Sequence, residues 1–131
     1  MSKRTVFIVD DETPMRKKYK KLFVSNGFRV LEAPNAMEVA NTLMRERSNL
    51  DLILLDINIA EVDGRDIFDI IDEYAPGMPV IVSSVYPTSE QKFRIPHADD
   101  YFSKSQKDEI LLTKVRNLLG IAEEKPSPKK R

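Results

Sequence analysis

Residues 6–12 read Val-Phe-Ile-Val-Asp-Asp-Glu, so an apolar run passes directly into a cluster of acids. Residues 52–56 (Leu-Ile-Leu-Leu-Asp) repeat the pattern, and residues 101–104 (Tyr-Phe-Ser-Lys) end a third stretch on a lysine. Short, continuously apolar runs predict strands of a parallel sheet whose two faces are both covered. Because the carboxyl ends of parallel strands share one edge, where ligands bind, we expect these acids and the lysine to meet in one crevice.

The carboxylates of that crevice are Asp10, Asp11 and Asp56, and Lys104 supplies an ammonium group. Crowded carboxylates repel each other unless a cation joins them. Oxygen ligands of this kind suit a hard divalent ion. The sequence therefore predicts a divalent-metal site at the edge of the sheet.

The composition is that of one globular domain. The chain has 131 residues, of which 41% are hydrophobic, and its formal net charge is zero. Nothing in this charge balance argues for nucleic-acid or membrane binding, and the lack of cysteines excludes disulfides and thiolate metal sites. No apolar run reaches the roughly 20 residues of a membrane span, so a cytoplasmic protein is expected. Residues 121–131 (IAEEKPSPKKR) are interpreted as a flexible tail or linker.

Two helical patterns lie between the apolar runs at residues 6–9 and 52–55. Thr13 and Pro14 predict the N-cap and first position of a helix that Gly27 ends. The apolar face of this helix is formed by Met15, Tyr19, Leu22 and Phe23. Asn35 and Glu38 predict a capping box for a second helix. The apolar stripe of the second helix is formed by Val39, Ala40, Leu43 and Met44.

Five strands are predicted to alternate with the helices, at residues 6–9, 28–31, 52–55, 79–83 and 100–103. Later helices are predicted around residues 67–74, 89–95 and 111–119. This alternation predicts an α/β fold, and the right-handed crossover rule permits a doubly wound parallel sheet. The five-stranded, (βα)5 flavodoxin-like strand order 2-1-3-4-5 is the common solution for such a chain.

The chain resembles the receiver domain of two-component response regulators over about residues 4–120. The matching segments are VDDE at 9–12, LLDINIAEVDG at 54–64, VIVSS at 80–84 and DDYFSKS at 99–105. The resemblance implies a signalling domain rather than an enzyme, which accepts a phosphoryl group from a histidine kinase or phosphotransfer protein. Phosphorylation would depend on Mg²⁺ and would change the conformation of the domain.

The resemblance also assigns the acceptor and the metal ligands. Asp56 is expected to be the phosphoacceptor. Asp11, Asp56 and the backbone carbonyl of Asn58 are expected to hold Mg²⁺, and Asp10 to act through a bound water. Because Mg²⁺ keeps several waters, few protein ligands suffice.

Other positions match the family's phosphate-binding and switch residues. Lys104 and Ser84 are expected to bind the phosphoryl oxygens, and Ser84 and Tyr101 to occupy the switch positions. By the same resemblance, the side chains of Asn58 and Tyr86 flank the path of the water that hydrolyses the aspartyl phosphate. They are therefore expected to set its lifetime, with Tyr86 shielding the phosphate.

The chain departs from the family's pattern around this site. Ile59-Ala60 replace Met-Pro, Val85 replaces a small residue, and Ser105 replaces a proline. Residues 88–98 (TSEQKFRIPHA) replace a longer amphipathic helix, so a short or distorted fourth helix is expected. In the family this surface passes on the signal. An unknown downstream effector, or a second copy in a homodimer, is expected to bind the face of the fourth helix, fifth strand and fifth helix.

Three alternatives stay open beside this interpretation. The first is a nonphosphorylated interaction module that keeps the fold, which the complete set of acids and the lysine disfavours. The second is a flavin-binding protein, whose phosphate loop residues 10–12 would repel. The third is an aspartyl phosphohydrolase, whose Asp-x-Asp pattern the sequence VDDET does not fit.

Two further features have ordinary interpretations. Arg16, Lys17, Lys18, Lys20 and Lys21 form a basic run that is expected to be a solvated helix face, with an acidic partner as the alternative. His97, the only histidine, is expected to be solvated in a loop rather than to carry phosphate or bind metal.

Overall fold

The computed structural model describes residues 3–57 and 64–121. It contains a five-stranded parallel sheet in the order β2-β1-β3-β4-β5. The predicted doubly wound fold and its strand order are therefore confirmed. The strands are β1 Thr5–Val9, β2 Arg29–Ala33, β3 Leu52–Asp56, β4 Val80–Ser84 and β5 Asp100–Ser103.

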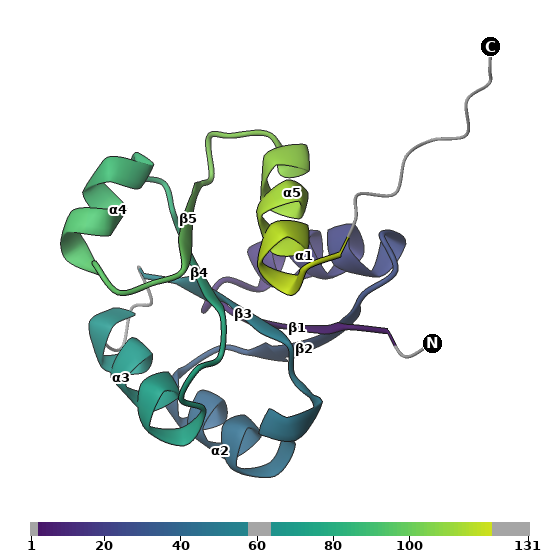
Figure 1. Ribbon diagram of the computed structural model, residues 1–131, viewed down its shortest axis with the longest axis vertical. Coiled ribbons are helices and arrows are strands. Elements are labelled where there is room, and N and C mark those ends of the chain that lie inside the picture. Colours follow the sequence, from purple (N-terminus) through teal and green to yellow (C-terminus); the bar gives the residue numbers. More distant parts are fainter. Residues whose placement is uncertain (1–2, 58–63, 122–131) are drawn as a thin grey trace.

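Helices cover both faces of the sheet (Figure 1). α1 and α5 lie on one face, α2 and α3 lie on the other, and α4 stands beside β5. The helices are α1 Thr13–Ser25, α2 Ala36–Glu46, α3 Gly64–Tyr74, α4 Thr88–Arg94 and α5 Asp108–Leu119, with a short 3-10 helix, η1, at Arg47–Asn49. α4 is as short as the sequence predicted, whereas η1 was not expected.

The core is divided by the sheet into two layers. Along each strand alternate side chains point to opposite faces, so Ile8 packs toward α1 and α5 while Phe7 packs toward α2 and α3. Both side chains are at most 1% exposed. β2 is an edge strand, and its residues Arg29 and Glu32 are exposed. Every residue of β1 and β3, in the middle of the sheet, is buried. This packing brings the carboxyl ends of β1, β3, β4 and β5 to one edge.

The helix starts differ in part from the predictions. Asn35 caps α2 as expected, because its Oδ1 accepts a hydrogen bond of 2.9 Å from the backbone N–H of Glu38. The prediction of Thr13 as N-cap of α1 is wrong: Glu12 occupies that position and its side chain makes no capping hydrogen bond. Pro14 lies in the first turn, where a missing N–H costs nothing.

The buried face of α2 and the bounds of β2 differ from the predictions. Met44 is 61% exposed although it was assigned to the apolar stripe of α2, and Thr42 is buried instead. The buried side of α2 is centred on Val39 and Leu43, so the helix turns position 44 outward. β2 starts and ends later than predicted, because the N–H of Arg29 bonds to the carbonyl of Arg4 and aligns the strand with β1.

β4 begins at Val80 rather than at Pro79. Proline has no N–H for the ladder, although the carbonyl of Pro79 accepts from Ile53 at 2.9 Å. Among the helices of residues 3–57 and 64–121, none has the length and apolar character needed to cross a bilayer.

Candidate functional site: an acidic pocket at the sheet edge

Three carboxylates meet where β1 and β3 end. Asp10, Asp11 and Asp56 each offer an oxygen, and these oxygens lie within 4.8 Å of one another. Asp10 is 2% exposed and Asp56 is 4% exposed, while Asp11 is half-buried. The predicted meeting of the three acids is therefore confirmed. Their donor set consists of oxygens alone, which suits a hard divalent cation such as Mg²⁺.

Lys104 lies between two of these acids. Its Nζ is 3.5 Å from Asp10 Oδ2 and 3.6 Å from Asp56 Oδ2, and its side chain is 14% exposed. Its backbone N–H donates to the carbonyl of Ser84 at 2.7 Å, which ties the end of β5 to the end of β4. One ammonium compensates part of the repulsion between two buried carboxylates. The pocket still holds more negative than positive charge.

Arg16 supports the connection between β1 and α1, a role that the basic run in the sequence did not predict. Its Nη1 donates to the backbone carbonyl of Asp10 at 2.7 Å, and its Nε lies 3.4 Å from Glu32 Oε1 on β2. Lys20 reaches the other Glu32 oxygen at 3.5 Å. The expectation that Arg16 belongs to a solvated basic face is wrong, since its side chain is only 15% exposed. Lys17, Lys18, Lys20 and Lys21 are exposed as predicted.

A second backbone contact positions Asp10 itself. The N–H of Glu12 donates to Asp10 Oδ1 at 2.9 Å. Together with Lys104 on Oδ2, this contact gives each oxygen of the buried carboxylate a partner. These two contacts fix the orientation of the Asp10 carboxylate at the end of β1.

The β4–α4 connection borders the pocket on the far side. Ser84 is fully buried, and its Oγ accepts a hydrogen bond of 3.3 Å from the N–H of Tyr86. Val85 is 65% exposed, so its side chain points away from the core. The guanidinium of Arg94 lies 4.5 Å from the centre of the Tyr86 ring, a stacking contact that restrains the ring.

Tyr101, predicted to occupy a switch position, is a buried residue of β5. It is 8% exposed, and its hydroxyl donates to the backbone carbonyl of Ile95 at the end of α4. Burial raises the pKa of this phenol above its usual value. Tyr101 therefore joins β5 to α4 in this structure.

Gln91 is a further residue that sequence reasoning missed. It is fully buried on α4, and its amide nitrogen donates to the carbonyls of Tyr86 at 2.8 Å and Phe102 at 2.9 Å. The amide thus links the β4–α4 connection to β5. A glutamine in a short polar segment gives no sequence signal of burial, so only the packing of α4 identifies it.

Two positions named in the sequence analysis, Asn58 and His97, lie outside this pocket or outside the described residues. Asn58, with Ile59 and Ala60, lies outside the described residues. His97 is exposed, as expected for a solvated loop residue.

Comparisons with known proteins agree with this geometry. The family model of the response regulator receiver domain matches residues 6–116. A receiver domain protein (CheY-like) from Methanospirillum hungatei has a TM-score of 0.78 and 26% identity, covering 91% of this chain and 95% of its own. The Thermotoga maritima response regulator TrrA, solved in complex with Mg²⁺–BeF, has a TM-score of 0.78 and 26% identity, covering 88% of this chain and 99% of its own.

The curated sequence relatives include a transcriptional regulatory protein and a phosphotransferase. The probable transcriptional regulatory protein SilR of Salmonella typhimurium is 31% identical over 116 residues, which are 87% of this chain and 50% of that protein. Sporulation initiation phosphotransferase F of Bacillus subtilis is 28% identical over 86 residues, 66% of this chain and 68% of that protein. The match covers half or less of the length of the first curated relatives.

With the fold, the pocket and these relatives in agreement, the class is that of phosphorelay signalling domains. The chain belongs to the response regulator receiver domain family.

Proposed function

We propose that this receiver domain accepts a phosphoryl group on a carboxylate oxygen of Asp56, in a Mg²⁺-dependent reaction. The donor is a histidine kinase or a phosphotransfer protein. The observation that supports this most directly is the pocket itself: three carboxylates within 4.8 Å, with the Lys104 ammonium 3.6 Å from Asp56. A nonphosphorylated interaction module, the alternative, gives no reason to bury like charges together.

In the proposed reaction, Asp56 attacks the phosphorus of a phosphohistidine. The new bond joins an Asp56 oxygen to phosphorus while the bond between phosphorus and the imidazole nitrogen breaks, leaving its electron pair on that nitrogen. Bound Mg²⁺ would neutralise negative charge on the transferring group. Lys104 and Ser84 would bind phosphoryl oxygens and hold the group in place.

Asp11 and Asp56 are the proposed side-chain ligands of the ion, with the backbone carbonyl of Asn58. Asp10, whose two oxygens contact Lys104 and the Glu12 amide, would act through a bound water. All of these ligands are oxygens, as Mg²⁺ prefers.

Acetyl phosphate and intact-mass spectrometry test the proposal. With Mg²⁺, the protein is expected to gain the mass of one phosphoryl group, and EDTA is expected to prevent the gain. A protein that stays at its original mass with both acetyl phosphate and a cognate donor would support the interaction-module alternative.

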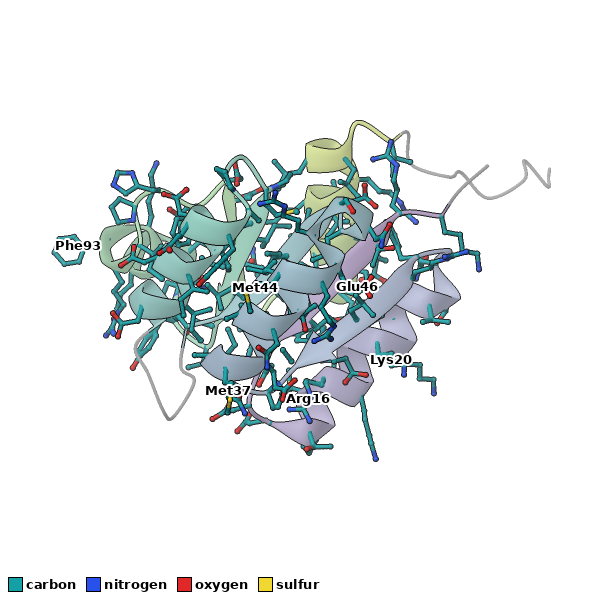
Figure 2. All side chains as sticks on the ribbon, turned by 90° about the horizontal axis from the view of Figure 1, so that it is seen from below. Arg16, Lys20, Met37, Met44, Glu46 and Phe93 are labelled. Atoms are coloured by element: carbon teal, nitrogen blue, oxygen red, sulfur yellow. The ribbon has the colours of Figure 1, made fainter. Side chains whose placement is uncertain are left out.

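The conformational signal is proposed to pass from Ser84 to Tyr101. Lys104 shares the pocket with Asp56 and bonds through its backbone to Ser84. Gln91 and Tyr101 both connect α4 to β5, so a shift of the β4–α4 connection would reach α4. An effector, or a second copy, is proposed to bind the α4–β5–α5 face, where Phe93 is 88% exposed and points away from the body of the molecule (Figure 2).

Lys104→Ala is expected to keep the fold but to uncouple phosphorylation from α4. Removing the ammonium leaves two buried carboxylates less compensated, so the free energy of unfolding should fall by about 2 kcal/mol. Amide exchange over residues 84–104, with and without beryllofluoride, measures the coupling. Lys107→Ala, an exposed change in the same connection, is the control. A response equal to that of the parent in Lys104→Ala would contradict the assigned role.

Tyr86→Ala is expected to shorten the half-life of the phosphoprotein several-fold, because the ring would no longer shield the phosphate from water. Decay of the phosphorylated mass with time measures it. Arg94→Ala should shorten the half-life less, because it removes only the stacking contact that restrains the Tyr86 ring. Lys92→Ala, an exposed change on the same helix, should leave the half-life unchanged. An unchanged or longer half-life in Tyr86→Ala would show that the ring does not guard the site.

A further inference from the structure

Two buried hydroxyl groups lie beneath Asp56 and have no part in the function described above. Tyr19 comes from α1 and is 2% exposed, and Ser83 comes from β4 and is 1% exposed. Their apolar neighbours on this face of the sheet include Ile8, Leu54 and Ile81, which lie in the same cluster as Tyr19. A core of this kind has no structural need for two hydroxyls.

Ser83 is the neighbour of Asp56 in the sheet. The two residues are register partners in β3 and β4, and the N–H of Ile57 donates to the carbonyl of Ser83 at 3.3 Å. Partners in adjacent parallel strands lie about 4.8 Å apart with their side chains on the same face. The Ser83 hydroxyl therefore flanks the Asp56 carboxylate.

Within the described part of the chain, the Ser83 hydroxyl makes no hydrogen bond. Its Oγ is buried and has no hydrogen-bond partner of ordinary geometry. An unpaired buried hydroxyl destabilises a fold, and an apolar residue of similar size would not carry that cost. A cost of this kind indicates a donor that is needed in another state of the site.

Tyr19 approaches the same point from the helix side. Its hydroxyl lies near that of Ser83 without forming a hydrogen bond of ordinary geometry, and it is close enough to Asp10 and Asp56 to feel both charges. Burial is the main cause that raises the pKa of Tyr19 to about 12. The phenol is therefore neutral at physiological pH and can donate its proton in a hydrogen bond.

We propose that Tyr19 and Ser83 form a hydroxyl pair that positions Asp56 for phosphoryl transfer. Tyr19 orients the Ser83 hydroxyl, and Ser83 donates its O–H to the Asp56 carboxyl group when that group takes its reactive arrangement. The hydrogen bond fixes the side-chain rotamer that attacks phosphorus. Both are positioning residues, because neither touches the phosphoryl group. This inference rests on the proposed phosphorylation of Asp56.

Two substitutions test the pair, since each deletes one hydroxyl and little else: Ser83→Ala and Tyr19→Phe. Phosphorylation by acetyl phosphate at saturating Mg²⁺ is expected to slow roughly tenfold in each variant. The double variant should be no slower than the slower single variant, because residues that act as a unit are not additive. Thr42→Val removes a buried hydroxyl from α2, on the other face of the sheet, and should phosphorylate at the parent rate.

Thermal unfolding is the second measurement, and it separates positioning from simple packing. The metal-free midpoint should stay unchanged or rise in Ser83→Ala, because an unpaired hydroxyl has been removed. The upward shift of the midpoint on adding Mg²⁺ and beryllofluoride should be smaller in both variants than in the parent.

Single variants that phosphorylate within about twofold of a normally phosphorylated parent would overturn the pair alone. So would a slower rate accompanied by a lower metal-free midpoint, because that result assigns the hydroxyls to packing. A parent that is not phosphorylated on Asp56 in the same assay would overturn the proposed function and, with it, this inference.

Discussion

Asp56→Asn is expected to fold normally and to incorporate no phosphoryl group. Asparagine keeps the shape of the side chain, but its amide cannot attack phosphorus as a carboxylate does. The loss should be complete within detection, because Asp10, the other acid beside Lys104 in the described residues, is 2% exposed and already has Lys104 and the Glu12 amide on its two oxygens. Intact mass after incubation with acetyl phosphate and Mg²⁺ measures the result.

The matched control is Asp72→Asn, which removes an exposed carboxylate from α3 and should incorporate one phosphoryl group as the parent does. A gain of mass in Asp56→Asn would place the acceptor elsewhere, most directly on Asp10 or Asp11. Peptide mapping of that product would then identify the residue.

Asp11→Asn is expected to have two opposite effects. It should abolish Mg²⁺ binding and, with it, phosphorylation, because Asp11 is the more accessible of the two proposed carboxylate ligands. It should also stabilise the metal-free protein by about 1 kcal/mol. Two charges about 5 Å apart repel by about 3 kcal/mol at an effective dielectric constant of 20, and solvent and Lys104 reduce that value.

Calorimetric titration with Mg²⁺ and urea unfolding in EDTA measure the two effects. Glu12→Gln, the exposed acid next in the chain, should change neither. If Asp11→Asn bound Mg²⁺ with the affinity of the parent, the metal site would have to be drawn from other ligands. If it were less stable without metal, repulsion among the three acids would not be the dominant effect of this side chain.

The sequence by itself determined the parallel α/β fold and the place of the acidic pocket. Continuous apolar runs such as residues 6–9 can be satisfied only when both faces of a strand are covered, and helical patterns lay between them. Acids at the ends of two such runs, Asp10 and Asp56, had to share an edge in any parallel sheet. These are local patterns, and local patterns are readable from a single chain.

Only the tertiary structure decided how the pocket is supported. In the sequence, Arg16 is one of several basic residues in a run. In the structure it is largely buried, because its guanidinium contacts Glu32 on β2 and the carbonyl of Asp10 after β1. Gln91 became buried when α4 packed on β5. Tyr19 counted as one apolar position of a helix face, and Ser83 as one residue of a strand. Their hydroxyls met beside Asp56 because α1 lies across the strands whose register sets Ser83 next to that acid. Contacts between segments far apart in the chain depend on register and helix placement, which no local pattern encodes.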